Sequence, residues 1–67
     1  MNLIEGLQAE ANRRREILPQ YEAIGASGMF GATMLRQEIK KAEEAIAGGD
    51  VVEMVRLYKE LSEMEVK

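Results

Sequence analysis

The residues best suited to bind a charged ligand are three consecutive arginines, Arg13 to Arg15, and a glycine-rich stretch further along the chain. Arg14 occupies a helical position where the surrounding pattern calls for an apolar side chain. Such an arginine can extend its charged end into solvent, or pair with Glu10 one helical turn earlier. It can also lie at an interface or bind an anion. We favour an arginine that extends into solvent or pairs with Glu10 over one at an interface or anion site, because arginine is rarely buried unless it is paired.

The stretch from Gly25 to Gly31 contains three glycines, with Ser27 as a candidate helix N-cap. Backbone N–H groups at the start of a helix can bind an anion. The candidate anion or partner site therefore comprises Arg13, Arg14, Ser27, Gly28 and Met29. The simpler interpretation, which we favour, is a tight helical hairpin whose glycines serve the backbone geometry, with Phe30 buried.

The residue types in this sequence give little support for catalysis. The chain has no cysteine and no histidine, so the commonest nucleophile, general base and metal ligand are missing. Most carboxylates fall on predicted polar helix faces, and adjacent Glu43 and Glu44 point in different directions on a helix. The glycine-rich stretch lacks the lysine-serine ending and the preceding strand of a phosphate-binding loop. We expect no enzyme activity, no cofactor and no metal.

The net charge is −3, with 9 basic and 12 acidic residues interspersed along the sequence. This balance disfavours a dedicated duplex-DNA binder, so nucleic acid is not an expected partner. No apolar run approaches the roughly 18 residues that cross a bilayer, and the first residues do not resemble a signal peptide. We expect a cytoplasmic protein without a membrane partner.

The elements that must position these residues are helices. Strong helix formers dominate, and no alternation of period two indicates a strand. The sequence predicts a single all-α domain, 1–67, with three helices in an up-down-up hairpin array, at about 2–24, 28–47 and 51–65. Asn2 with Glu5 should cap the first helix, and Pro19 should kink or break it. We favour a kink, because the apolar spacing continues in phase through Leu18 and Tyr21.

The apolar stripes predict which helix faces pack together. The first helix offers Ile4, Leu7, Ala11, Leu18 and Tyr21; the second Gly28, Ala32, Leu35, Ile39, Ala42 and Ile46; the third Val51, Met54, Val55, Tyr58 and Leu61. Gly25 and Gly48 should end the first two helices, and Asp50 should cap the third. Leu35 and Ile39 should form the centre of the core, so truncating either should nearly unfold the domain.

A lone three-helix unit of this size would leave apolar residues exposed. The predicted interface comprises Leu3, Ile17, Met34, Leu57 and Met64. Methionine is common at adaptable binding surfaces, and closed two-fold symmetry is the commonest oligomeric outcome. We therefore predict a homo-oligomer, most simply a dimer.

The motifs Tyr21–Gly25, Gly28–Gly31, Ala42–Asp50 and Tyr58–Leu61 together resemble small accessory proteins of tailed bacteriophages and prophages. The resemblance implies a cytoplasmic protein that binds and modulates a host protein, or sequesters a small molecule, and it assigns no functional residues. The leading hypothesis is a non-enzymatic homo-oligomeric accessory factor that binds a host protein through its helix faces. The alternative is a small-ligand protein that binds an anion or nucleotide through the Gly25–Gly31 loop and nearby arginines.

Overall fold

The computed structural model describes residues 2–64. They form helix α1 (Leu3–Ile24), the short 3-10 helix η1 (Gly25–Gly28), α2 (Met29–Gly48) and α3 (Val51–Glu63). No strand occurs within this described part, so the prediction of an all-helical chain is confirmed. The predicted end of the third helix, at 65, lies outside the described residues.

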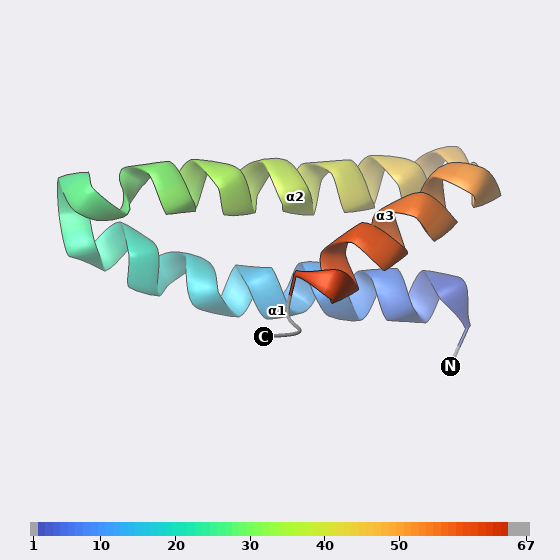
Figure 1. Cartoon of the computed structure of the whole chain (residues 1–67), viewed down its shortest axis with the longest axis horizontal. Helices are drawn as coiled ribbons and strands as arrows, with labels where there is room; N and C mark the ends of the chain where they lie inside the picture. Colours follow the sequence, from blue (N-terminus) through green and yellow to red (C-terminus); the bar gives the residue numbers. More distant parts are fainter. Residues whose placement is uncertain (1, 65–67) are drawn as a thin grey trace.

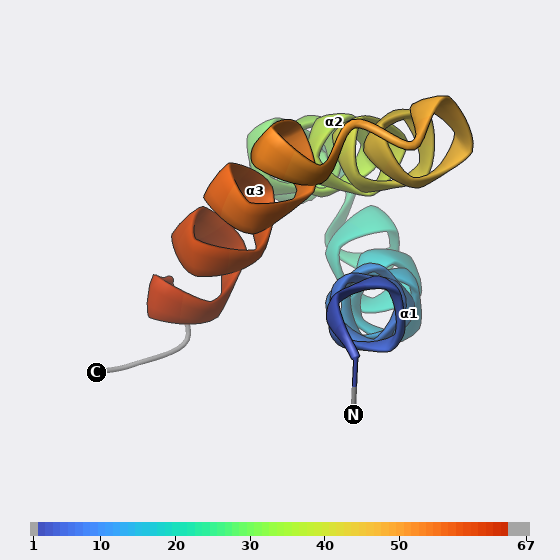
Figure 2. The same cartoon turned by 90° about the vertical axis from the view of Figure 1, so that its right-hand side faces the viewer.

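Helices α1 and α2 form an antiparallel hairpin, and α3 folds back over one side of it. Figure 1 shows α3 crossing the pair obliquely, and Figure 2 shows it to one side of both helices. The third helix therefore departs from the regular up-down-up array that the sequence predicts. It is also the shortest, with 13 residues against 22 in α1 and 20 in α2. As a result, α3 runs over only part of the hairpin.

The helix ends follow from local sequence signals. The Asn2 side chain accepts a hydrogen bond from the Glu5 N–H at 2.8 Å, and the Glu5 carboxylate accepts one from the Asn2 N–H, which confirms the capping box. Asp50 caps α3 by accepting from the Glu53 N–H at 3.2 Å. Gly49, rather than the predicted Gly48, takes the left-handed position after α2, with a φ of 68°.

One expectation about the second helix is wrong, and one of the two alternatives for the first helix is excluded. Ser27 does not cap α2, because η1 leads into α2 through right-handed helical backbone and Gly28 precedes α2 without a side-chain cap bond. Helix α1 is not broken at Pro19 but continues through it to Ile24. Figure 1 shows the last turns of α1 rising toward the start of α2. Both features keep the hairpin a continuous helical structure.

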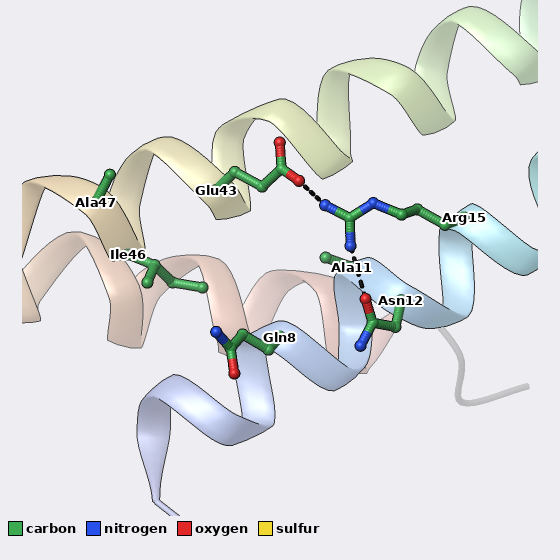
Figure 3. Close-up of a pocket in the computed structure, with 7 residues that line it drawn as sticks. All are labelled: Gln8, Ala11, Asn12, Arg15, Glu43, Ile46 and Ala47. Atoms are coloured by element: carbon green, nitrogen blue, oxygen red, sulfur yellow. Dashed lines mark hydrogen bonds and ion pairs between the residues drawn. The ribbon is translucent and has the colours of Figure 1, made fainter.

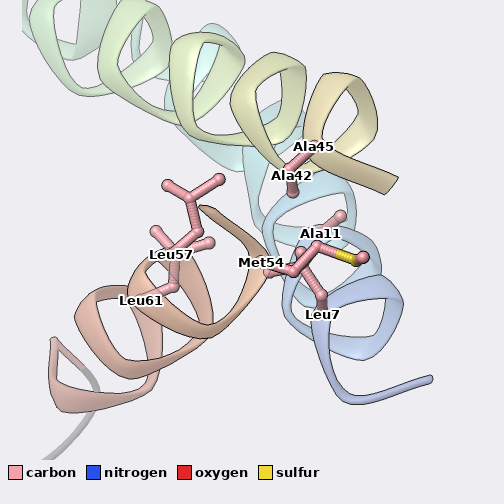
Figure 4. Close-up of a cluster of buried hydrophobic side chains, with 7 residues drawn as sticks. All are labelled: Leu7, Ala11, Ala42, Ala45, Met54, Leu57 and Leu61. Carbon is pink, nitrogen blue, oxygen red and sulfur yellow. The ribbon is translucent and has the colours of Figure 1, made fainter. Parts of the chain in front are cut away.

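The hydrophobic core lies where all three helices meet, away from the hairpin turn (Figure 4). Its buried residues are Leu7 and Ala11 of α1, Ala42 and Ala45 of α2, and Met54, Leu57 and Leu61 of α3. The two alanines of α2 are small, so the large side chains of α3 can approach its backbone closely. Leu3, Ile46 and Tyr58 pack against this cluster.

The core is displaced from its predicted centre. Ile39 is buried but lies outside the main cluster, and Leu35 is only half-buried. On α3 the buried stripe is Met54, Leu57 and Leu61, so Leu57 was wrongly assigned to an exposed interface and is 2 % exposed. Val51 and Val55, predicted to be buried, are exposed, as are Ile4 and Tyr21. On α3, the face that packs against the hairpin is therefore a neighbour of the predicted one, centred on Leu57.

Close contact at the hairpin turn requires glycine. A Cβ atom at position 28 would lie 2.1 Å from the carbonyl oxygen of Tyr21, which belongs to the backbone of α1 and cannot move alone. A Cβ at position 31 would lie 2.5 Å from the Tyr21 ring. Gly28 and Gly31 therefore let the two helices meet at the turn. Gly48, by contrast, has open space around it and an ordinary helical conformation.

We predict that Gly28→Ala lowers the free energy of unfolding by about 1–3 kcal/mol, the range for overpacking a tight contact. Gly48→Ala is the matched control, because it meets no neighbour, and alanine favours helix by up to about 1 kcal/mol over glycine. Thermal melts followed by circular dichroism compare the two. Equal melting temperatures would contradict the close approach at the turn.

We predict that Leu57→Ala lowers the free energy of unfolding by about 2–5 kcal/mol, as for other buried leucines. Leu35→Ala should have a smaller effect, because Leu35 is half-buried outside the main cluster. Val55→Ala on the exposed face of α3 should change stability by less than about 0.5 kcal/mol. Urea denaturation ranks the three losses in the free energy of unfolding. A larger loss for Leu35→Ala than for Leu57→Ala would place the centre of the core on α2.

Candidate functional site

Arg14 lies buried among all three helices. Its Nε donates to Glu38 Oε1 of α2 at 2.7 Å, and its Nη1 donates to the Glu10 side chain at 2.9 Å and to the Glu10 carbonyl at 3.1 Å. Its Nη2 donates to the Leu61 carbonyl of α3 at 3.0 Å. The Arg14 residue is 5 % exposed. The expected pairing with Glu10 is confirmed, but it occurs inside the protein rather than at the surface.

The surroundings of Arg14 keep it charged. Burial by itself would lower the pKa of the guanidinium, but the hydrogen bonds to Glu38 and Glu10 outweigh burial and raise its pKa. The Met64 sulfur also lies 3.9 Å from Nη2. The guanidinium thus binds two carboxylates and two carbonyls of its own chain. This geometry fits a structural tie between helices, because the donors of the guanidinium are directed at groups of its own chain.

A polar groove of about 400 Å³ lies between α1 and α2, and no residue of α3 lines it (Figure 3). Its lining residues are Gln8, Ala11, Asn12, Arg15, Glu43, Ile46 and Ala47. Arg15 forms an ion pair with Glu43 across the groove and donates to Asn12 Oδ1 at 2.6 Å. The charged groups of Arg15 and Glu43 therefore pair with each other. The groove holds amides and an ion pair over an apolar floor, and it has no nucleophile with an adjacent base.

A second hollow, which we call the open groove, begins where α3 ends. It has a volume of about 280 Å³ and is lined by Arg13, Arg14, Ile17, Tyr21, Leu35, Glu38 and Met64. A smaller neighbouring hollow of about 70 Å³ lies on the α2 side of Met64 and includes Met34, Gln37 and Lys41. The walls of the open groove are mainly apolar, and the Arg14–Glu38 ion pair lies at its end. Such a groove suits an apolar side chain from outside.

Several large apolar side chains are exposed around the hairpin turn, and we call this set of residues the tip surface. It consists of Tyr21, Ile24, Met29, Phe30 and Met34. Phe30, the chain's single phenylalanine, is 79 % exposed, and Ile24 is 60 % exposed. Phe30 was predicted to be buried, and this prediction is wrong. Its position was readable from helical spacing: Phe30 and Met34 are four residues apart, on the face opposite the buried positions Ala32 and Ile39.

Within residues 2–64, no group of three or more acidic, histidine or cysteine side chains is placed to hold a metal ion. None of the helices in this part combines the length and the hydropathy of a bilayer-crossing segment. The chain matches no protein-family model, no curated protein and no solved structure. The resemblance to bacteriophage accessory proteins therefore stays a prediction.

The structure does not bring the predicted anion site together. Gly28 is buried, while Ser27 and Met29 are exposed at the hairpin turn. Arg14 lies ten residues before the end of α1, a separation of about 15 Å along the helix. Arg13 is exposed at the same level as Arg14, with its guanidinium 3.9 Å from Glu10. The arginines and the glycine-rich turn therefore occupy different parts of the molecule.

The predicted interface residues lie in different environments in the structure. Met34 and Met64 are exposed, and Ile17 is half-buried at the wall of the open groove. Leu3 is half-buried against the core, and Leu57 is fully inside it. Three of the five thus lie together around the end of α3, although only the structure shows that they are neighbours.

We predict that Arg14→Leu lowers the free energy of unfolding by about 3–5 kcal/mol, because the Glu10 and Glu38 carboxylates would lose their buried cation. Arg14→Lys should recover only part of the loss, since an ammonium cannot reproduce the planar set of donors. Arg15→Leu is the control: its exposed ion pair with Glu43 should contribute less than about 1 kcal/mol. Urea denaturation measures all three, and similar losses for Arg14→Leu and Arg15→Leu would contradict the structural role.

Proposed function

We propose that this chain is a non-enzymatic interaction module that binds another protein through the half of the hairpin that α3 leaves uncovered. The observation that supports this proposal is the tip surface, above all the exposed Phe30. Large apolar residues gathered on a small surface are typical of protein-binding sites. Aromatic residues and methionine are also enriched where proteins meet.

The tip surface adds little to the stability of the chain itself. The buried cluster that joins the three helices lies at the other end of the hairpin, and none of the five tip residues belongs to it. An exposed phenylalanine in water gains no burial energy. A partner that covered Phe30, Ile24 and Met29 would supply that burial. The proposal therefore assigns binding to a surface that the fold does not otherwise use.

The partner of this surface is a separate protein or a second copy of the chain. The bacteriophage resemblance implies a host protein. The homodimer stays a prediction, made for a different interface that shares only Met34 with the tip surface. The alternative of anion or nucleotide binding has less support, because the predicted arginines lie away from the glycine-rich turn and Arg14 is bound by carboxylates.

We predict that Phe30→p-benzoylphenylalanine, which replaces one aromatic side chain by a photo-crosslinking one, gives covalent adducts on irradiation in cells. The control is Val52→p-benzoylphenylalanine, because Val52 is equally exposed, at 79 %, but lies in the first turn of α3, far from the hairpin turn. Denaturing gels and mass spectrometry identify the adducts.

Adducts from position 30 and none from position 52 would support the tip surface. An adduct of twice the chain mass identifies a second copy, and any other mass identifies a different protein. Equal yields from both positions, or none from position 30, would overturn the proposed function.

A further inference from the structure

The part of the hairpin nearest the turn is almost free of charge. Residues 17–35 include a single charged side chain, Glu22, although charged residues make up 31% of the whole chain. Glu22 is itself paired, since its carboxylate lies 2.6 Å from Arg36 Nη2. Depletion of charge, together with aromatic and methionine side chains, distinguishes the centre of protein interfaces from the rest of a protein surface. This half of the hairpin therefore has the composition of an interface.

The side of this half that lies in line with α3 is apolar, and we call it the uncovered face. Helix α1 is about 33 Å long and α3 about 20 Å, so α3 cannot cover the whole hairpin. Figure 1 shows no third helix beside the turn. The uncovered face includes the open groove and the residues that continue it at helical spacing. Its members are Ile17, Tyr21 and Ile24 of α1, Met34 and Leu35 of α2, and Met64 at the end of α3.

The charged groups beside the uncovered face are of both signs, and most are paired within the chain. Those that line the open groove and the neighbouring hollow are Arg13, Arg14, Lys41, Glu38 and Glu60. Arg14 binds Glu38 at 2.7 Å, and the Arg13 guanidinium lies 3.9 Å from Glu10. A face with mixed, paired charges does not select a partner of either sign. It can meet an identical face, because such a contact sets no large like-charged areas against each other.

The uncovered face also fits a second copy in shape. Helix α3 adds a layer one helix thick, about 10–12 Å, to one half of the hairpin. The other half lacks this layer over about 15 Å, from the level of Arg14 to the end of α1. Two such steps are complementary. When two hairpins lie antiparallel with their uncovered faces together, each occupies the layer that the α3 of the other leaves empty.

The surface and the charge distribution both suit this contact. The six side chains of the uncovered face and Phe30, which is 79 % exposed, would bury on the order of 1,000 Å² in two copies, the lower bound for a specific interface. Acidic residues gather at the end farthest from the turn, among them Glu5, Glu44, Asp50 and Glu53. In the antiparallel pair these two acidic ends point in opposite directions, so their repulsion is least.

We propose that two copies of this chain associate through their uncovered faces, with Ile17 near the two-fold axis. This inference rests on the proposed function and names a second copy as the partner. Homodimer interfaces are more apolar than those of proteins that associate transiently, and a nearly uncharged face matches the first kind. Closed two-fold symmetry is also the commonest oligomeric arrangement. Of the interface residues predicted from the sequence, Ile17, Met34 and Met64 take part, whereas Leu3 and Leu57 belong to the core region.

Sedimentation equilibrium of the whole chain tests this contact. Wild type should have twice the chain mass at concentrations of tens of micromolar. Ile17→Glu and Ile17→Lys should each weaken the dimer at least ten-fold, because like charges would meet near the axis. An equimolar mixture of the two variants should associate at least five-fold more tightly than either alone, since opposite charges then meet. Circular dichroism melts confirm that both variants are folded.

Ala23→Glu and Ala23→Lys are the matched controls. Ala23 is exposed in the same half of α1 but does not line the open groove, so these variants should keep the dimer within two-fold of wild type. A monomeric wild type, a mixture of the Ile17 variants that associates no better than either alone, or equal losses at positions 17 and 23 would overturn the inference.

Chemical crosslinking gives a second measurement that does not depend on a charged variant. The chain has no cysteine, so Ile17→Cys introduces a single thiol, and a bis-maleimide can then join only two copies. Ile17→Cys should give a crosslinked dimer and Val52→Cys should not. Val52 is 79 % exposed and Ile17 only half-buried at the groove wall, so random collisions would link position 52 first. More crosslinking at position 52 than at position 17 would contradict the contact.

The two proposals fail in different ways. Photo-adducts from position 30 to a different protein, with a wild type that sediments as a monomer, would leave the proposed function standing and remove the second copy. A dimer that the mixed charges at position 17 restore, without adducts from position 30, would remove the tip surface and keep the contact between uncovered faces.

Discussion

The Arg14 network is the interaction on which the arrangement of the helices depends. One guanidinium joins Glu10 of α1, Glu38 of α2 and the Leu61 carbonyl of α3, so a single buried side chain links all three helices. Burying these charges has a desolvation penalty that good geometry must offset, and such networks can define one arrangement over others that are equally apolar. Here the network holds the last turns of α3 at one level of the hairpin. That level separates the covered half of the face from the open half.

The position of the turn in the chain explains how a sequence of interspersed charges becomes a polarised molecule. Because the turn lies near the middle of the sequence, the central residues gather around one end of the hairpin, while α3 starts near the other end and runs back to the level of Arg14. The central segment has an excess of basic residues, and the terminal segments have an excess of acidic ones. Neither half of the linear sequence shows this separation. A partner would meet the electrostatic field of the folded chain, which steers association as well as strengthening it.

Local features of this fold were predictable, and features that depend on contacts between helices were not. The capping box at Asn2, the cap at Asp50 and the helical breaks each involve residues within one turn, so helix boundaries follow from the sequence. Leu57 and Phe30 were misplaced because burial depends on how each helix is rotated against its neighbours. Glu38 as a partner of Arg14 lies 24 residues away along the chain, and no local pattern indicates that pair. The candidate site could therefore be located only from the structure, although the helical spacing of Phe30 and Met34 already indicated an outward-facing position for both side chains.

The division of the hairpin into covered and open halves lets so short a chain fold and still keep a surface available for binding. A chain of 67 residues can bury only a small core, and here α3 completes that core with Met54, Leu57 and Leu61 at the end farthest from the turn. A longer α3 would cover Ile17 and Leu35 as well, which would strengthen the monomer and remove the groove. Ending α3 at the Arg14 network leaves that apolar surface half-buried, with the charged side chains of Arg13, Arg14 and Glu38 beside it. The free energy that burial of this surface does not give to the fold is available to any molecule that covers it.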